Sequence, residues 1–192
     1  MAPELGALSF LEGTASDVAS RLLGCELERE LDGRVARVRI VETEAYDQAD
    51  VASHSYRGET ERTKVMFGHA GHLYVYFTYG MHYCANVVTG TKGHGAAVLI
   101  RAVEPLVGVA LIEERRGKTG VATTNGPAKL CQALGIDSRL NGHDLRGGEL
   151  RLVAHPPLLA HAITQTTRIG ISQGKDVPWR FYVTESPFVS RP

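Results

Sequence analysis

The feature that most constrains the fold is an alternation of apolar and polar residues that occupies residues 25–46 and turns back on itself once. The first part, CELEREL, alternates with a period of two, and the second part, RVARVRIVETEAY, does so over a longer stretch. Asp32-Gly33 separates the two parts, and this pair is typical of a two-residue hairpin turn. The sequence therefore predicts two antiparallel strands, of which the second is long.

Shorter patterns predict the other elements of the first half. Thr14 followed by Asp17 is a weak capping box, which predicts a short helix that runs to Gly24. A third and a fourth strand are expected, one on each side of the YGMH turn at residues 79–82. A fifth is expected over AAVLIRAV, residues 96–103.

Proline and glycine mark the elements of the second half. Pro105 is expected to open a helix that ends near Gly117, because proline is favoured at the first helical position. GPAKLCQALG is expected to form another helix, with Pro127 in its first turn and Gly135 at its C-cap. Short strands are then expected over residues 151–153, 167–171 and 180–183.

Strands joined by hairpins, with helices inserted between them, predict an α+β fold around a mainly antiparallel sheet with one protruding hairpin. A chain of 192 residues suits one globular domain, which we expect to span residues 1–192. The three cysteines, Cys25, Cys84 and Cys131, are far apart and odd in number. They predict reduced core residues, with neither a disulfide framework nor a structural zinc site.

Two aspects of composition bear on location and partners. No apolar run approaches the ~20 residues of a membrane span and no signal peptide is apparent, so we expect a cytoplasmic protein with no membrane partner. Residues 1–61 hold 13 acids and 6 bases, whereas residues 62–192 hold 8 acids and 15 bases. This asymmetry permits a basic face for a nucleic acid, but charges scattered over a solvated surface would give the same counts.

The long strand carries carboxylates beyond its apolar residues. If it runs without a bulge, Glu42, Glu44 and Tyr46 lie on the same face as Ile40. A core face that ends in carboxylates requires a partner or a chemical role, because an unpaired buried charge is costly. The alternative is that the strand emerges into solvent after Ile40. Arg101 lies inside an apolar strand and needs an anion, which one of these glutamates would supply.

The segment LYVYFTYGMHYCAN, residues 73–86, contains four of the chain's seven tyrosines. Tyr74 and Tyr76 share one strand face, and Tyr79 lies beside a glycine at the predicted hairpin tip. Core packing remains the alternative for Tyr74 and Tyr83. An aromatic residue at a hairpin tip instead favours stacking on a base, or filling the gap that a flipped nucleotide leaves in a duplex.

Six motifs occur in order along the chain: VETEAY, the pair His54-Ser55, LYVYFTYGMHYCAN, VLIRAVEPL, GPAKLCQALGI, and RFYV with PFVS. Together they resemble the alkyladenine (3-methyladenine) DNA glycosylase family of base-excision repair, from about residue 8 to residue 190. The resemblance implies a monofunctional enzyme that flips alkylated or deaminated purines out of duplex DNA. It would hydrolyse the N-glycosidic bond and leave an abasic site.

The resemblance also implies roles for residues that match the family's motifs. Glu44 matches the general base that activates a water for attack at C1′, and Arg101 matches the arginine beside that water. Tyr79 matches the tyrosine that intercalates in place of the flipped nucleotide. An oxocarbenium-like transition state needs an anion near the sugar and a positioned water, which a carboxylate on an inward strand face can supply.

The base pocket and the DNA contacts follow from the same resemblance. Tyr46, His54 and Tyr76 match the aromatic walls, where a cationic alkylated purine would gain roughly 0.5 to 2 kcal/mol from cation–π contact. Asn86 matches the asparagine that opposes the amino group of guanine, and Ile171 is expected in the pocket or in the core. Contacts to the DNA backbone are expected from Arg62, Met66 and Lys129, the last at a helix N-terminus suited to a phosphate.

Cofactors are not expected. His69, His72 and His82 lie close together but lack an acid at ligand spacing, so no metal site is predicted. Phosphate-binding and dinucleotide-binding glycine motifs are absent from the sequence. Lys64 and Lys92 lie in polar loops that would not activate an amine, which favours water as the nucleophile.

The expected partner is double-stranded DNA with damaged purines, bound by a monomer that hands abasic sites to downstream repair enzymes. The alternative is a binding module that recognises damaged bases or another nucleic acid without cutting. Glu44 and Arg101 favour the enzyme, because a pure binder has no need of an anion beside the sugar.

Overall fold

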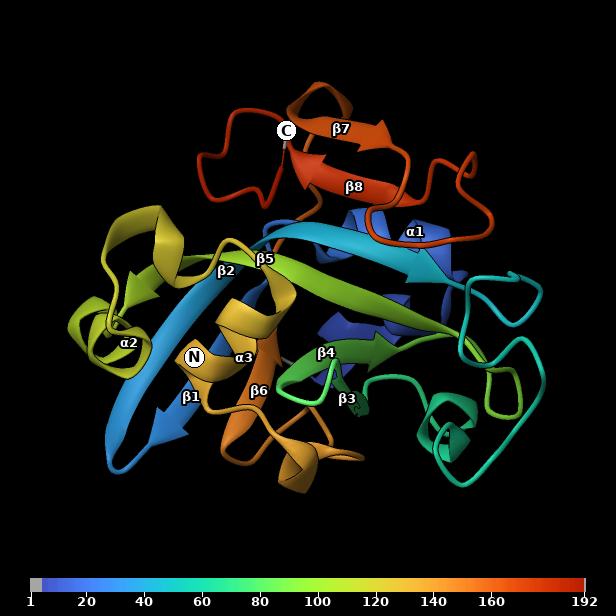
Figure 1. Cartoon of the computed structure of the whole chain (residues 1–192), viewed down its shortest axis with the longest axis horizontal. Coiled ribbons are helices and arrows are strands. Elements are labelled where there is room, and N and C mark those ends of the chain that lie inside the picture. Colours follow the sequence, from blue (N-terminus) through green and yellow to red (C-terminus); the bar gives the residue numbers. More distant parts are fainter. Residues whose placement is uncertain (1–4, 192) are drawn as a thin grey trace.

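The computed structural model describes residues 5–191 (Figure 1). Within that range the helices are α1 (Ala15–Leu22), α2 (Val109–Arg116) and α3 (Pro127–Leu134), with short 3-10 turns η1 (Leu5–Glu12), η2 (Lys64–Phe67), η3 (Gly120–Thr123), η4 (Ser138–Leu140) and η5 (Ala160–Ala162). The strands are β1 (Glu26–Leu31), β2 (Arg34–Tyr46), β3 (Leu73–Thr78), β4 (His82–Val88), β5 (Ala97–Val107), β6 (Leu150–Val153), β7 (Ile163–Thr166) and β8 (Arg180–Val183).

A curled antiparallel sheet organises these elements, in the order β3-β4-β5-β2-β1-β6. Strand β8 pairs with β7 as a hairpin and also with β2 at Glu42–Glu44, so the hairpin lies along the second half of the longest strand. In the view of Figure 1, α1 lies behind β2 and α3 lies in front of the sheet. The predicted α+β fold around an antiparallel sheet is confirmed.

Local sequence accounts for several element boundaries. Thr14 caps α1 as predicted, because its hydroxyl accepts a hydrogen bond from the Asp17 N–H at 3.3 Å. Asp32 and Gly33 have φ of 50° and 73°, which is the left-handed pair that a tight hairpin turn requires. Tyr79 and Gly80 repeat this geometry between β3 and β4, with φ of 51° and 68°.

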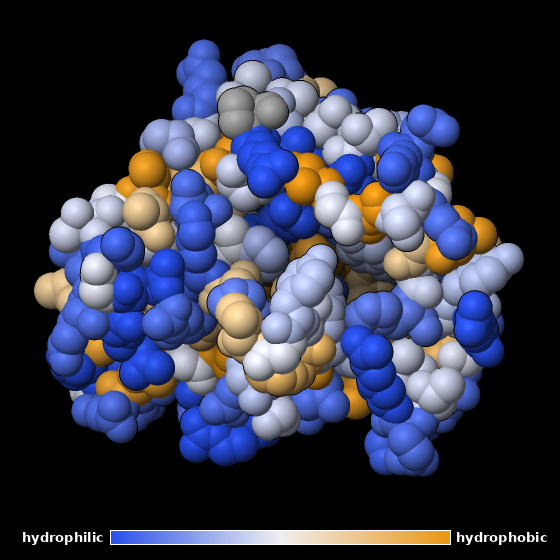
Figure 2. Space-filling view, in the orientation of Figure 1, coloured by the Kyte–Doolittle hydropathy of each residue, from blue (hydrophilic) through white to orange (hydrophobic). Residues whose placement is uncertain are grey.

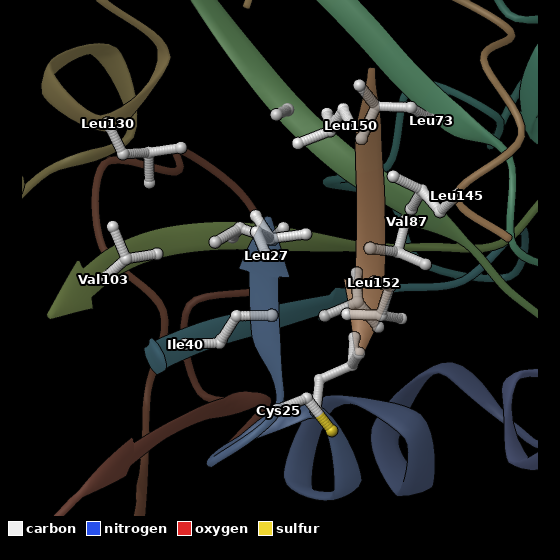
Figure 3. Packing of buried hydrophobic residues seen from close by; sticks show 14 of the residues in the cluster. Cys25, Leu27, Ile40, Leu73, Val87, Val103, Leu130, Leu145, Leu150 and Leu152 are labelled. Atoms are coloured by element: carbon white, nitrogen blue, oxygen red, sulfur yellow. The ribbon is translucent and has the colours of Figure 1, made fainter. Parts of the chain in front are cut away.

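The core is one cluster of buried hydrophobic side chains that extends in sequence from Leu8 to Phe181, and Figure 3 shows part of it. Leu27 and Ile40 from β1 and β2 contact the same cluster as Leu130 from α3 and Leu150 from β6. All three cysteines are free and buried, as predicted, and Cys25 and Cys131 belong to this cluster.

The helix predicted to begin at Pro105 is wrong. Strand β5 continues to Val107, Pro105 pairs with Val38, and α2 begins after Gly108. Proline is tolerated here because β4 pairs with β5 only at Ala97–Leu99, so β5 has a free edge at Pro105.

The strand predicted over residues 167–171 is also wrong, because the strand comes just before it, at Ile163–Thr166. Gly170 has φ of 75°, and the Arg168 side chain turns inward to donate to the Ala45 carbonyl at 2.9 Å. Those two features bend the backbone into a loop. The other late strands match their predicted positions.

None of the helices within residues 5–191 could span a lipid bilayer.

Candidate active site

A bulge in β2 decides where the two glutamates point. The pairing of β2 with β5 shifts between Ile40 and Glu42 and again between Glu42 and Thr43. After the shift, Thr43 donates to the Ala19 carbonyl of α1 at 2.8 Å and Ala45 joins the core. Glu42 and Glu44 therefore face away from the core side that Ile40 occupies.

This arrangement corrects both alternatives drawn from the sequence. The strand does not emerge into solvent after Ile40, because Glu42 and Glu44 have no exposed surface. Nor does the alternation continue unbroken onto one face, because the bulge exchanges the two faces. The carboxylates are buried on the side of the sheet that carries a cavity.

Arg101 from β5 links the two carboxylates. Its Nη1 donates to Glu44 Oε2 at 3.3 Å, and its Nε lies 3.4 Å from Glu42 Oε1. The Arg101 side chain is only 11% exposed, so these charges interact in a desolvated setting. The expected pairing of Arg101 with a strand glutamate is confirmed.

Two further donors converge on Glu44. The Tyr46 hydroxyl donates to Oε2 at 2.8 Å, and the Ile169 N–H donates to Oε1 at 2.7 Å. Burial, followed by the nearby Glu44 carboxylate, raises the pKa of Tyr46 well above its ordinary value, so the phenol keeps its proton and remains a donor. Glu44 is thus fixed from three directions.

The aromatic residues gather beside this carboxylate. The rings of His54 and Tyr76 meet edge to face with centroids 4.6 Å apart, and His54 Nδ1 lies 3.0 Å from the Tyr74 hydroxyl. Burial, and then the positive charge of Arg62, lower the pKa of His54, which keeps its ring neutral at pH 7. Tyr74 is buried at 2% exposure, as the core-packing alternative required, although it also borders the cavity.

A cavity of about 490 Å³ opens among these side chains. The space-filling view shows the face hollowed near its centre, with apolar surface inside and hydrophilic surface around it (Figure 2). The lining includes most residues expected at the site: Tyr46, His54, Arg62, Met66, Tyr76, Tyr79, Asn86, Arg101 and Ile171. Glu44 lies just behind the wall and touches three lining residues, Tyr46, Arg101 and Ile169.

Two of these residues have contrasting settings. Asn86 is buried, and its Nδ2 donates to the Tyr74 carbonyl at 3.0 Å, which fixes its amide in the cavity wall. Tyr79 is 83% exposed at the tip of the β3–β4 hairpin, beside the cavity. A large aromatic side chain held in solvent by a tight turn is available to contact a partner.

The three residues expected to contact DNA backbone differ in position. Arg62 is exposed, with its guanidinium 5.8 Å from the centroid of the Tyr76 ring. Lys129 is half-buried in the first turn of α3 and donates to Asn125 Oδ1 at 2.7 Å. Met66 is 2% exposed and packs with Tyr74 in the wall, so it lies behind the surface that a phosphate could reach.

Sequence reasoning missed several residues that build the site. Arg168 is fully buried, pairs with Asp50, and lies over the rings of Tyr46 and Trp179 at 4.7 and 5.5 Å. An arginine within TRIGI, a segment predicted to be a strand, was the available signal. Ile169, whose backbone N–H binds Glu44, carried no signal in its side chain.

The histidine cluster shows no ligand geometry in the described part of the chain. The rings of His69 and His72 are 6.3 Å apart, and His82 is exposed on β4. No group of three or more His, Cys, Asp or Glu side chains within residues 5–191 is placed to hold a metal ion.

Comparison with known proteins gives a consistent result. The family model for methylpurine-DNA glycosylase (MPG) matches residues 9–187. A protein of Carboxydothermus hydrogenoformans is 54% identical over 176 residues, which cover 91% of this chain and 92% of the relative. One from Methanoculleus marisnigri is 52% identical over 187 residues, covering 95% and 97% respectively. Both are named "Putative 3-methyladenine DNA glycosylase". The chain therefore belongs to the methylpurine-DNA glycosylase family and is, by that membership, a DNA N-glycosylase.

Proposed function

We propose that this protein removes damaged purines from duplex DNA by hydrolysis, with Glu44 as the general base. The observation that carries the proposal is a fully buried carboxylate held by Arg101, Tyr46 and the Ile169 N–H at the wall of an aromatic cavity. Buried ionisable groups with specific charge partners are concentrated at functional sites, and this carboxylate adjoins a cavity.

The chemical role of Glu44 follows from its setting. Cleavage of an N-glycosidic bond builds positive charge on the sugar, and a fixed anion nearby stabilises that charge. The same carboxylate can accept a proton from a water that attacks C1′, leaving an abasic site. Arg101 contacts Glu44 and lines the cavity, so it holds the carboxylate and faces the reacting atoms.

Recognition of the base rests on the aromatic walls. A flipped purine would stack among Tyr46, His54 and Tyr76, with Asn86 and Ile171 shaping the remaining surface. A cationic alkylated purine gains roughly 0.5 to 2 kcal/mol on such faces, whereas a neutral purine does not. Because His54 is neutral, it adds no opposing charge. We propose 3-methyladenine as the first substrate to test, in line with the names of the relatives.

The hairpin supplies the group that replaces the flipped nucleotide. Tyr79 projects into solvent beside the cavity mouth, where its ring would enter the minor groove. Arg62 at the mouth and Lys129 at the start of α3 would contact phosphates. Damaged double-stranded DNA is therefore the partner, and an enzyme that acts on abasic sites would consume the product.

Water is the nucleophile in this proposal. No lysine lines the cavity within the described residues, and Lys64 is paired with Glu61 on the surface at 2.8 Å. A covalent amine mechanism would need a desolvated lysine near the sugar. The enzyme would leave the DNA strand intact.

The test is a single-turnover assay of the purified protein on duplexes that carry 3-methyladenine, 7-methylguanine, hypoxanthine or ethenoadenine, with an undamaged duplex as control. Alkali reveals abasic sites, and borohydride traps any covalent amine intermediate. We expect strand breaks only after alkali and no trapped complex. Binding of the lesion duplexes without excision would instead support a non-catalytic damage-binding module.

A further inference from the structure

Glu42, the first carboxylate of VETEAY, has a bonding pattern that the proposed mechanism does not use. It is fully buried and accepts three hydrogen bonds, from Arg180 Nε at 2.7 Å, the Ser190 N–H at 2.7 Å and the Ser190 hydroxyl at 2.9 Å. It does not line the cavity. Its contact with the catalytic group Arg101 is the ion pair at 3.4 Å.

The donors to Glu42 come from the end of the chain. Arg180 begins β8, which pairs with β2 at Glu42–Glu44, and Ser190 lies in the segment beyond β8. Arg180 Nη2 also donates to the Arg191 carbonyl, which ties that segment to the same arginine. The segment beyond β8, residues 184–191, therefore packs against β2 behind the candidate active site. Ser190, which donates to Glu42, is 148 residues away from it in sequence.

Arg101 is shared between the two carboxylates. Its Nη1 donates to Glu44, but its buried Nε has no hydrogen-bond partner among the described residues and faces Glu42 only as an ion pair. The orientation of the Arg101 guanidinium therefore depends on its attraction to both carboxylates, Glu44 and Glu42. Without the charge of Glu42, nothing described holds the Nε edge.

Stability alone is a weak reason for this network. Replacing buried ion pairs with well-packed apolar residues is often neutral or stabilising, because desolvation offsets the Coulomb attraction. The Glu42 carboxylate instead accepts hydrogen bonds from one guanidinium, one main-chain N–H and one hydroxyl. Together these three donors fix the carboxylate in one geometry. Such a fixed anion is suited to orienting the arginine beside it.

We propose that Glu42 is a positioning residue: it is held by Ser190 and keeps Arg101 aligned with Glu44, so that Ser190, which lies beyond β8, supports the catalytic groups. This inference rests on the proposed function, because it needs Glu44 and Arg101 to act in excision. It predicts that changes at Glu42 and Ser190 slow the chemical step and leave binding of the lesion duplex intact.

The test compares Glu42→Gln, Ser190→Ala and Ser190→Thr with the parent. Glu42→Gln should slow single-turnover excision about 100-fold, the order expected when a catalytic group is displaced by roughly 1 Å. Ser190→Ala should slow it about tenfold, since one of three bonds to Glu42 is lost, and Ser190→Thr should recover most of the rate by restoring the hydroxyl. The dissociation constant for lesion duplex should change less than about threefold in all three.

Ser186→Ala is the matched control. Its hydroxyl accepts from the Phe188 N–H in the same segment and does not reach Glu42, so the excision rate should match that of the parent. Parental rates in folded Glu42→Gln and Ser190→Ala would overturn the inference. So would equal losses in binding and rate, or a Thr variant as slow as Ala.

Failure of the proposed function would look different. If the parent protein excises no base, the function itself fails. If the parent excises and Glu44→Gln does not, but Glu42→Gln is as fast as the parent, then only the positioning role is lost.

Discussion

Arg168 and Asp50 give the most quantitative prediction. Their side chains are 0% and 4% exposed, and Arg168 also donates to the carbonyls of Ala45 and Gly174 at 2.9 and 3.3 Å. Asp50→Asn would leave a buried guanidinium without its anion while keeping an acceptor of similar shape. Removing one partner of a buried ion pair costs about 3–5 kcal/mol, and we expect about 3 because the amide oxygen still accepts.

The assay is urea unfolding at 25 °C, followed by the fluorescence of Trp179. Trp179 is the chain's single tryptophan, and Arg168 lies over its ring at 5.5 Å, so the signal reports on this part of the molecule. Asp144→Asn is the control, because Asp144 pairs with Arg146 at the surface, where such a pair contributes about 0–1 kcal/mol. A loss below about 1 kcal/mol in Asp50→Asn, or equal losses in both variants, would show that the buried pair of Asp50 and Arg168 does not stabilise the fold.

The same pair supports the wall of the cavity. Arg168 lies 4.7 Å from the centroid of the Tyr46 ring, and the residue after it donates its N–H to Glu44. Loss of Asp50 should therefore loosen Tyr46 and the Ile169 N–H together. The excision rate of Asp50→Asn should fall by more than the loss of folded protein at 25 °C would explain.

Two further predictions concern the hairpin and the pocket histidine. Tyr79→Ser should weaken binding of a lesion duplex about 5- to 150-fold, since a stacked aromatic is worth ~1–3 kcal/mol. The urea midpoint should not change, because Tyr79 is 83% exposed; parental affinity would refute intercalation by Tyr79. The pKa of His54 is lowered in the folded protein from the ordinary 6.5, so the unfolded chain binds the proton first and stability should fall as pH drops below about 6.5. His54→Gln should lose less stability than the parent between pH 7.5 and 5.5. An identical pH dependence of the two proteins would contradict a lowered pKa for His54.

Elements with local signals were predictable from the sequence. The alternation in β1 and β2 and the Asp32-Gly33 turn specify a hairpin without help from the rest of the chain. Pro127 and Gly135 marked both ends of α3 in the same way. Pro105 misled because its missing N–H suits a helix start and a free strand edge equally well, and only the short reach of β4 decides between them.

Several residues that surround the cavity were named from the sequence, but the geometry that brings them together was not. The motifs identified Glu44, Arg101 and the aromatic walls, and the structure brings these residues together around one cavity. The bulge after Ile40 depends on pairing with β5, so the alternation of β2 alone could not reveal which face Glu44 would take. The bonds from Ser190 to Glu42 join segments 148 residues apart and left no local pattern.

In the proposed mechanism, the Glu44 carboxylate activates the water that cleaves the glycosidic bond. The most direct test is the single-turnover excision rate of Glu44→Gln beside that of the parent, with the dissociation constant measured on the same lesion duplex. Because general-base catalysis contributes about 10²–10⁴-fold, we predict a rate loss of that order with affinity within about threefold of the parent. A Gln variant that excises at the parental rate would rule out Glu44 as the general base.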